Sequence, residues 1–167
     1  MNMIEAVKSV LGQYVGFSGR ARRSEYWYWI LASTLVSMGL ALIEELLGLG
    51  ESGPISMIYS LAILLPGVAV TFRRLHDTGR SGWWIIGFYL SIAIVSSALL
   101  FSVLSTINGV DNGTSRQALF GVIGIILGLA FVIYAFAILY FLCQDSHVGA
   151  NKYGPNPKNE GNYDIFE

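Results

Sequence analysis

The amino-acid sequence predicts an all-α membrane protein, a four-transmembrane-helix bundle with a short N-terminal amphipathic helix and an irregular cytoplasmic C-terminal tail. Of its 167 residues, 54% are hydrophobic and only 13% are charged, which is about half the charge of a soluble domain. Four apolar stretches can each cross a hydrocarbon core of roughly 30 Å, which needs about 20 helical residues. None of these stretches has an Asp, Glu, Lys, Arg or His in its interior, so none shows the polar stripe of a soluble helix.

The four spans are expected at residues 26–43, 54–72, 83–107 and 118–143, within one membrane domain of residues 1–158. Polar turns separate the spans, and Pro54 stands at a helix first turn, where its missing N–H costs nothing. Pro66 lies inside the second span, where it predicts a kink rather than a break.

Two further segments flank the spans. Before the first span, six apolar residues fall on one helical face: Ile4, Val7, Val10, Leu11, Tyr14 and Val15. They predict a short helix that lies either at the membrane surface or as a soluble cap on the ends of the spans. After Cys143 the chain is rich in Asn, Gly and Pro, which predicts a non-helical and largely extended tail, flexible over residues 159–167.

Basic residues predict the orientation, because short cytoplasmic segments carry an excess of Lys and Arg. Three segments on one side hold nine of the ten basic residues: Lys8, Arg20, Arg22, Arg23, Arg73, Arg74, Arg80, Lys152 and Lys158. The other side holds Arg116 together with acidic residues such as Glu44, which is expected to be hydrated there. Both termini are therefore expected in the cytoplasm, with the bilayer and its anionic headgroups as partners. A net charge of −1 argues against a nucleic-acid partner.

Aromatic residues indicate the same membrane boundary. Six of them lie next to the basic segments: Tyr26, Trp27, Tyr28, Trp29, Trp83 and Trp84. Amphipathic rings prefer the level of the headgroups, so these residues are expected to form one belt on the cytoplasmic side.

Three polar segments would meet at the cytoplasmic end of such a bundle. The candidates for binding a ligand or headgroup there are Arg20, Arg22, Arg23, Arg73, Arg74, His76, Asp77 and Arg80. Arginines are suited to anchoring on anionic headgroups, and their planar geometry also suits bidentate pairing with carboxylates. Two interpretations are open: an anchor with structural salt bridges, or a site for an anionic headgroup or a partner protein.

The ends of the first two spans predict one particular ion pair. Glu25 begins the first span and Arg73 and Arg74 end the second, so antiparallel neighbours bring them to one depth. We expect Glu25 to pair with one of the two arginines, since a carboxylate at a partly dehydrated interface needs a strong partner.

A second structural contact is expected between the middle loop and the tail. We expect His76 or Asp77 to contact the tail near Asn151 and Tyr153. The Asn, Gly and Pro residues there specify turns, so the tail would fold back from Gly149 onward rather than extend freely.

The sequence favours a non-enzymatic role and assigns no catalytic residue, metal or cofactor. It has no HExxH motif, nucleophile elbow or phosphate loop. Its one cysteine, Cys143, excludes a multi-thiolate metal site within one chain. His76 and Asp77 are adjacent, so on a helix their side chains do not face each other. The alternative is a membrane enzyme that acts on a lipid or small molecule through these two residues and the arginines.

A small channel or transporter is the other alternative, and it would require a homo-oligomer. The spans hold no ionisable group, which argues against a coupled transporter. Gly124 and Gly128 form a GxxxG pair that allows close helix approach. Packing within the chain is the favoured use of this pair, and self-association is the other.

Three motifs make the chain resemble a known family. They are RRLHDTGRSGWW at residues 73–84, YVGF and GRARRSEYW within residues 14–27, and G-x-N-x-YGPNPK at residues 149–158. With these the chain resembles a family of uncharacterised bacterial inner-membrane proteins, domain of unknown function 805. The resemblance implies an inner-membrane location and no known activity. Two departures are Val148, where relatives have proline, and a longer apolar region after Trp84, so the four-helix count rests on this sequence.

Overall fold

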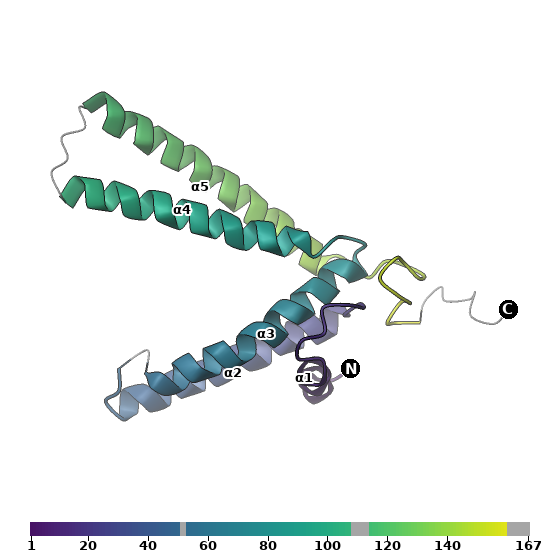
Figure 1. Ribbon diagram of the computed structural model, residues 1–167. Coiled ribbons are helices and arrows are strands. Elements are labelled where there is room, and N and C mark those ends of the chain that lie inside the picture. The colour runs from purple at the N-terminus through teal and green to yellow at the C-terminus, as the bar shows by residue number, and fades with distance from the viewer. Residues whose placement is uncertain (51–52, 108–113, 160–167) are drawn as a thin grey trace. The chain divides into compact units, whose positions relative to one another are not determined.

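The computed structural model describes residues 1–50, 53–107 and 114–159 (Figure 1). Within them the chain forms five helices: α1 (Met3–Gly12), α2 (Arg23–Leu46), α3 (Pro54–Asp77), α4 (Trp83–Ile107) and α5 (Thr114–Cys143). The four longer helices are long and apolar enough to cross a membrane. The all-α fold with four candidate spans is thus confirmed, whereas the expected flexibility of residues 159–167 falls almost wholly outside the described residues.

The chain divides into two compact units, which are described separately. The three-helix unit contains residues 1–82 together with the tail from Leu142, and the hairpin unit contains residues 83–141. In the three-helix unit, α2 and α3 form an antiparallel pair, and α1 packs mainly on α2 (Figure 1). The single domain of residues 1–158 stays a prediction.

Helix α3 is longer than the predicted span and carries functional candidates at its end. It runs without a break through Pro66 and ends at Asp77 rather than at residue 72. The five additional residues, 73–77, have buried side chains that contact other protein groups. Arg73, Arg74 and Asp77 consequently have fixed helical positions.

Glu44 joins the far ends of α2 and α3, and the expectation that it is hydrated is wrong. Its side chain is fully buried, and its Oε1 accepts hydrogen bonds from the backbone N–H groups of Ile55 (2.7 Å) and Ser56 (3.1 Å). These N–H groups belong to the first turn of α3, where no intrahelical acceptor exists. Glu44 therefore caps a neighbouring helix, and its negative charge complements the positive end of that helix.

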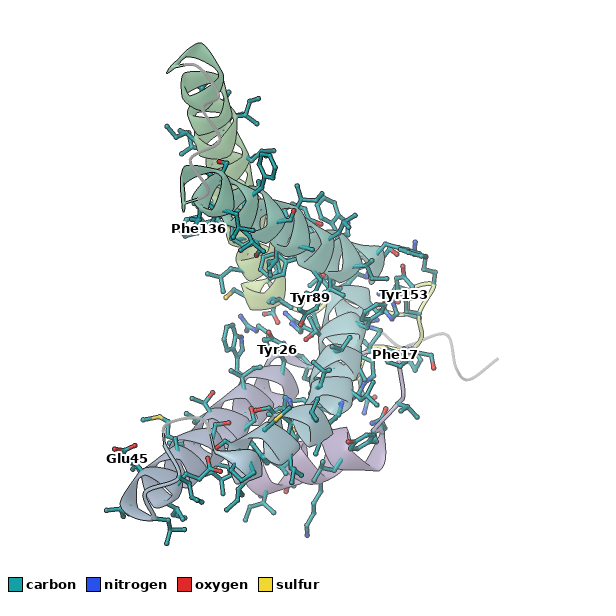
Figure 2. The ribbon with its side chains drawn as sticks, turned by 60° about the vertical axis from the view of Figure 1, so that its left-hand side comes forward. Phe17, Tyr26, Glu45, Tyr89, Phe136 and Tyr153 are labelled. Carbon is teal, nitrogen blue, oxygen red and sulfur yellow. The ribbon has the colours of Figure 1, made fainter. Side chains whose placement is uncertain are left out.

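The hairpin unit is held mainly by aromatic side chains. The rings of Trp84 and Tyr134 stack at 5.8 Å, and those of Phe88 and Phe131 at 5.5 Å. The Tyr134 hydroxyl also donates a 2.7 Å hydrogen bond to the Trp84 carbonyl. Figure 2 labels Tyr89 and Phe136 on this unit, both with exposed side chains. This apolar surface suits contact with lipid.

The glycines of α5 do not contact α4 within the hairpin unit. A Cβ atom added at Gly121, Gly124 or Gly128 would meet no atom within 4 Å. Helix α4 therefore does not approach this face. Packing within the chain and self-association through this face both stay predictions.

Candidate functional site

The arginine cluster consists of Arg20, Arg22, Arg23, Arg73, Arg74 and Arg80, and its centre is a carboxylate shared by two arginines. Asp77 Oδ1 accepts from Arg20 Nε at 2.9 Å, and Asp77 Oδ2 accepts from Arg74 Nη1 at 2.5 Å. The side chains of all three residues are at most 1% exposed. A buried carboxylate with a guanidinium on each oxygen keeps its charge compensated.

The remaining N–H groups of these two arginines bind the backbone of the tail. Arg20 donates to the carbonyls of His147 (2.7 Å) and Gly149 (2.8 Å). Arg74 donates from Nε to the Leu142 carbonyl (3.0 Å) and from Nη2 to that of Gln144. Guanidinium groups of α3 and of the segment before α2 therefore hold the backbone of the tail.

Glu25 pairs with Arg73, as the sequence predicted, with 3.2 Å between Glu25 Oε1 and Arg73 Nη1. The same carboxylate oxygen accepts from the Ser9 hydroxyl of α1 at 3.0 Å. The other two guanidinium nitrogens of Arg73, Nε and Nη2, are buried and find no hydrogen-bond partner within the described residues. Burying such groups unpaired costs about 1–3 kcal/mol each, so Arg73 is the arginine whose pairing is least complete.

The tail folds back onto the end of α3, and its predicted contact is made by His76. The His76 ring stacks on Tyr153 with 3.8 Å between ring centroids and 7° between planes. Its Nδ1 lies 3.2 Å from the Gly19 carbonyl, and Asn151 Nδ2 donates to the His76 carbonyl at 2.9 Å. Figure 2 shows Tyr153 at this end of α3.

The tail is built of turns, so the expectation of a largely extended chain is wrong. Asn151 and Gly154 form a short antiparallel bridge, and Asn151 Oδ1 accepts from the Tyr153 N–H at 2.9 Å. Asn156 is buried, and its Oδ1 accepts from the Lys158 N–H at 2.8 Å. Asparagine side chains that bond their own backbone two residues on favour turns over extended chain.

The other basic residues of the cluster lie nearer the surface. Arg22 donates to the Pro157 carbonyl, and Arg80 donates to Gln144 Oε1 at 2.5 Å. The exposed carboxylate of Asp145 binds Lys158 at 2.7 Å and Arg23 at 3.2 Å. The hydrogen bond from Lys158, and then that from the Ser146 N–H, lower the pKa of Asp145 from its ordinary value.

The eight candidate residues thus all lie in the three-helix unit, but they differ in access. The buried side chains of Arg20, Arg74 and Asp77 contact one another and the tail. Sequence reasoning missed the backbone carbonyls as their acceptors, since every residue has a carbonyl and no pattern marks the ones used. Among the described residues, no group of three His, Cys, Asp or Glu side chains is placed to hold a metal ion.

The six residues of the predicted aromatic belt differ in their exposure. Trp83 is exposed, and Trp27, Tyr28 and Trp84 are partly exposed. Two of the six predicted belt residues, Tyr26 and Trp29, are instead buried in the three-helix unit. They lie on the face of α2 that packs against the protein, and a belt of these six residues at headgroup depth stays a prediction.

Comparison with known proteins gives the chain a family. The family model described as protein of unknown function (DUF805) matches residues 14–155. The inner membrane protein YhaH of Escherichia coli is 37% identical over 154 residues, which cover 90% of this chain and 94% of YhaH. The inner membrane protein YhaI of the same organism is 51% identical over 82 residues, 49% of this chain and 69% of YhaI. No solved structure matches the chain.

Proposed function

This chain belongs to the DUF805 family of proteins of unknown function, whose relatives lie in the inner membrane, and on that premise we propose that it is a non-enzymatic membrane protein whose arginine end binds anionic lipid headgroups. In this proposal both termini are cytoplasmic. The bias of nine basic residues to one side supports that orientation, because it is the side that short cytoplasmic segments occupy.

The observation that carries the proposal is a division of roles among the basic residues. Arg20 and Arg74 have their N–H groups occupied by Asp77 and by tail carbonyls. Lys8 and Lys152, in contrast, have exposed side chains on the same unit. In this proposal the buried arginines stabilise the fold of the tail against α3. The exposed ammonium groups of Lys8 and Lys152 can then bind the phosphates of lipid headgroups.

The charge of this end supports an anionic partner. Against the nine basic residues stand seven carboxylates in the same segments, of which Glu5, Glu25, Asp77 and Asp145 lie within the described residues. The remaining excess of positive charge would face the leaflet that is rich in anionic lipid, where each basic residue is worth about 1 kcal/mol.

The surroundings of His76 and Asp77 support a structural role over the enzymatic alternative. Asp77 is fully buried between two guanidinium groups, and His76 is stacked under Tyr153. A general acid or base must reach the proton it transfers, and both side chains instead contact protein groups.

Lipid binding is tested on the full chain by native mass spectrometry in mixed micelles. We expect retained phosphatidylglycerol or cardiolipin to exceed retained phosphatidylcholine. The double variant Lys8→Gln/Lys152→Gln should weaken retention of the anionic lipids by roughly tenfold or more, given about 1 kcal/mol per charge. Arg116→Gln, which removes the basic residue of the opposite side, is the control. Equal loss in both variants, or no preference for anionic lipid, would refute the proposal.

The orientation is tested by reporters fused to each terminus. We expect green fluorescent protein to fluoresce and alkaline phosphatase to be inactive at both ends, because both would be cytoplasmic. Active phosphatase at the C-terminus would mean that one of the last two helices does not cross the membrane. In that case the tail with Lys152 would lie on the opposite side of the membrane from Lys8, the other proposed headgroup-binding residue.

A further inference from the structure

Helix α3 is continuous, but one of its backbone carbonyls lacks the usual intrahelical hydrogen bond. A residue distant in the sequence donates to this carbonyl instead. Pro66 has no N–H, so the carbonyl of Ala62, four residues earlier, loses its intrahelical partner. The hydroxyl of Tyr14, which follows α1, donates a hydrogen bond to this carbonyl. In a hydrocarbon environment no water is available for an unpaired carbonyl, so a protein donor is needed there.

This hydrogen bond fixes the depth of the segment that follows α1. Ala62 lies eleven residues before Arg73, which corresponds to about 16 Å along the helix at 1.5 Å per residue. The chain then returns along α3: the Phe17 ring packs on Phe72 at 5.4 Å, and Arg20 reaches Asp77. Figure 2 shows Phe17 beside α3. Tyr14 therefore lies well inside the span and not at the arginine end.

The large apolar side chains of α1 face away from the protein. The buried residues of this helix are Ala6 and Val10, and the partly buried Ser9 beside them bonds Glu25. Ile4 and Leu11, seven residues apart and so on one face, are 65% and 47% exposed. A soluble cap would bury these side chains and expose the small ones.

The neighbouring surface of α3 indicates what covers this face. At the depth set by the Tyr14 hydrogen bond, Ile58, Leu61 and Leu65 of α3 are also exposed. These residues belong to a span, where exposed aliphatic side chains contact lipid. Helix α1 ends two residues before Tyr14, so its exposed face leads toward that surface. Lys8 lies beside Ile4 on the helix and is exposed, so its ammonium can extend toward headgroups.

We infer that α1 and the turn after it are inserted in one leaflet of the bilayer, with Ile4 and Leu11 among the acyl chains, and that Tyr14 holds them there by closing the gap that Pro66 leaves in α3. The partner of this face is thus lipid and not a second protein. The inference is independent of headgroup binding, and the leaflet is the cytosolic one in the orientation proposed above.

The placement is tested with spin labels on the full chain in lipid vesicles. In a Cys143→Ser background, single nitroxides are attached after Ile4→Cys, Leu11→Cys and, as the polar control on the exposed tail, Lys152→Cys. At the first two positions we expect high accessibility to oxygen and low accessibility to a nickel chelate, with the reverse at the third. Nickel access at positions 4 and 11 would mean a water-exposed cap. Low access to both reagents would mean a protein partner, and either result overturns the inference.

The role of Tyr14 is tested by a double-mutant cycle with Pro66. Tyr14→Phe removes the donor, and we expect the unfolding equilibrium to shift several-fold toward the unfolded state. Pro66→Ala restores the backbone N–H, so in that background Tyr14→Phe should have almost no effect. Tyr28→Phe, on the partly exposed ring of α2, is the control. An effect of Tyr14→Phe that is equal in both backgrounds would show that the hydroxyl does not serve the Ala62 carbonyl.

Discussion

The two units of this chain hold themselves together by different means. In the three-helix unit, two ion-pair groups, a carboxylate cap and arginine–carbonyl hydrogen bonds join α2, α3 and the tail. In the hairpin unit, α4 and α5 are joined by ring contacts and by a hydroxyl–carbonyl hydrogen bond. Both units consist of helices with apolar surfaces, so the difference lies in their buried polar groups.

The difference shows what gives a membrane helix a fixed partner. Lipid tails are as apolar as leucine, so an apolar helix gains little by leaving lipid for another apolar helix. A buried charge, however, is strongly destabilised unless its partner is present. Asp77 and Glu25 therefore specify their neighbours, while the aliphatic residues of α4 and α5 do not. The following predictions test this contrast, from the largest expected effect to the smallest.

The largest effect is expected from Asp77→Asn, which removes the charge shared by two buried arginines. Breaking a buried pair by removing one partner costs about 3–5 kcal/mol. We expect a large fall in the midpoint of thermal unfolding in micelles, and cleavage of the tail by trypsin at Lys152 in the native state. The control is Asp145→Asn. The carboxylate of Asp145 is 60% exposed, so its removal should change the midpoint of thermal unfolding little. Equal behaviour of the two variants would show that the ion pairs of Asp77 do not hold the tail in place.

Glu44→Gln is expected to have a smaller effect at the opposite end of α2. The amide keeps one oxygen as acceptor but loses the charge that faces the N-terminus of α3. A capping and dipole contribution of about 1–2 kcal/mol should be lost. Glu45→Gln, a change at the exposed neighbouring residue, should leave thermal unfolding unchanged. If both variants unfold alike, the cap does not stabilise the pairing of α2 with α3.

Sequence reasoning succeeded where the signal was local or was fixed by the ends of helices. The spans follow from the length of apolar runs, and the Glu25–Arg73 pair follows from two antiparallel helix ends at one depth. It failed where a partner is backbone. Pro66 marks one carbonyl as unpaired, but nothing in the pattern points to Tyr14, 48 residues away. Glu44 was misjudged for the same reason, because its acceptance of the α3 N–H groups requires knowing how α2 and α3 are paired.

The hairpin unit should respond weakly to the loss of its hydroxyl contact. Tyr134→Phe removes the 2.7 Å hydrogen bond to the Trp84 carbonyl but leaves the ring stack intact. Hydrogen bonds between membrane helices average about 0.6 kcal/mol, so the shift in unfolding should be several times smaller than for Asp77→Asn. Tyr140→Phe, on an exposed ring, is the control. If Tyr134→Phe lowered stability as much as Asp77→Asn, the two units would not differ in how strongly they depend on their buried polar groups.

The smallest effect is a pH dependence of the tail at Asp145. Its pKa in the folded chain is lowered, chiefly by the hydrogen bond from Lys158. A group whose pKa is lower in the folded state stabilises that state at pH values above its unfolded pKa, which is about 3.9 for Asp. This contribution is lost as the pH falls through the folded pKa. Because the carboxylate is exposed, water and salt screen the effect.

Amide hydrogen exchange in residues 144–158 is the measurement, followed from about pH 6 down to about pH 3 and corrected for the intrinsic exchange rate at each pH. We expect protection near Lys158 to fall in the last part of this range, and to fall less in Asp145→Asn, which has no charge to lose. About 0.5 M salt should reduce the difference between the two proteins, since the Debye length is then only a few ångströms. Protection around His147, whose carbonyl is bound by Arg20, should persist over the same range, because a guanidinium does not titrate there. Simultaneous loss at both positions would mean that the tail is held at its surface pairs and not by the buried arginines.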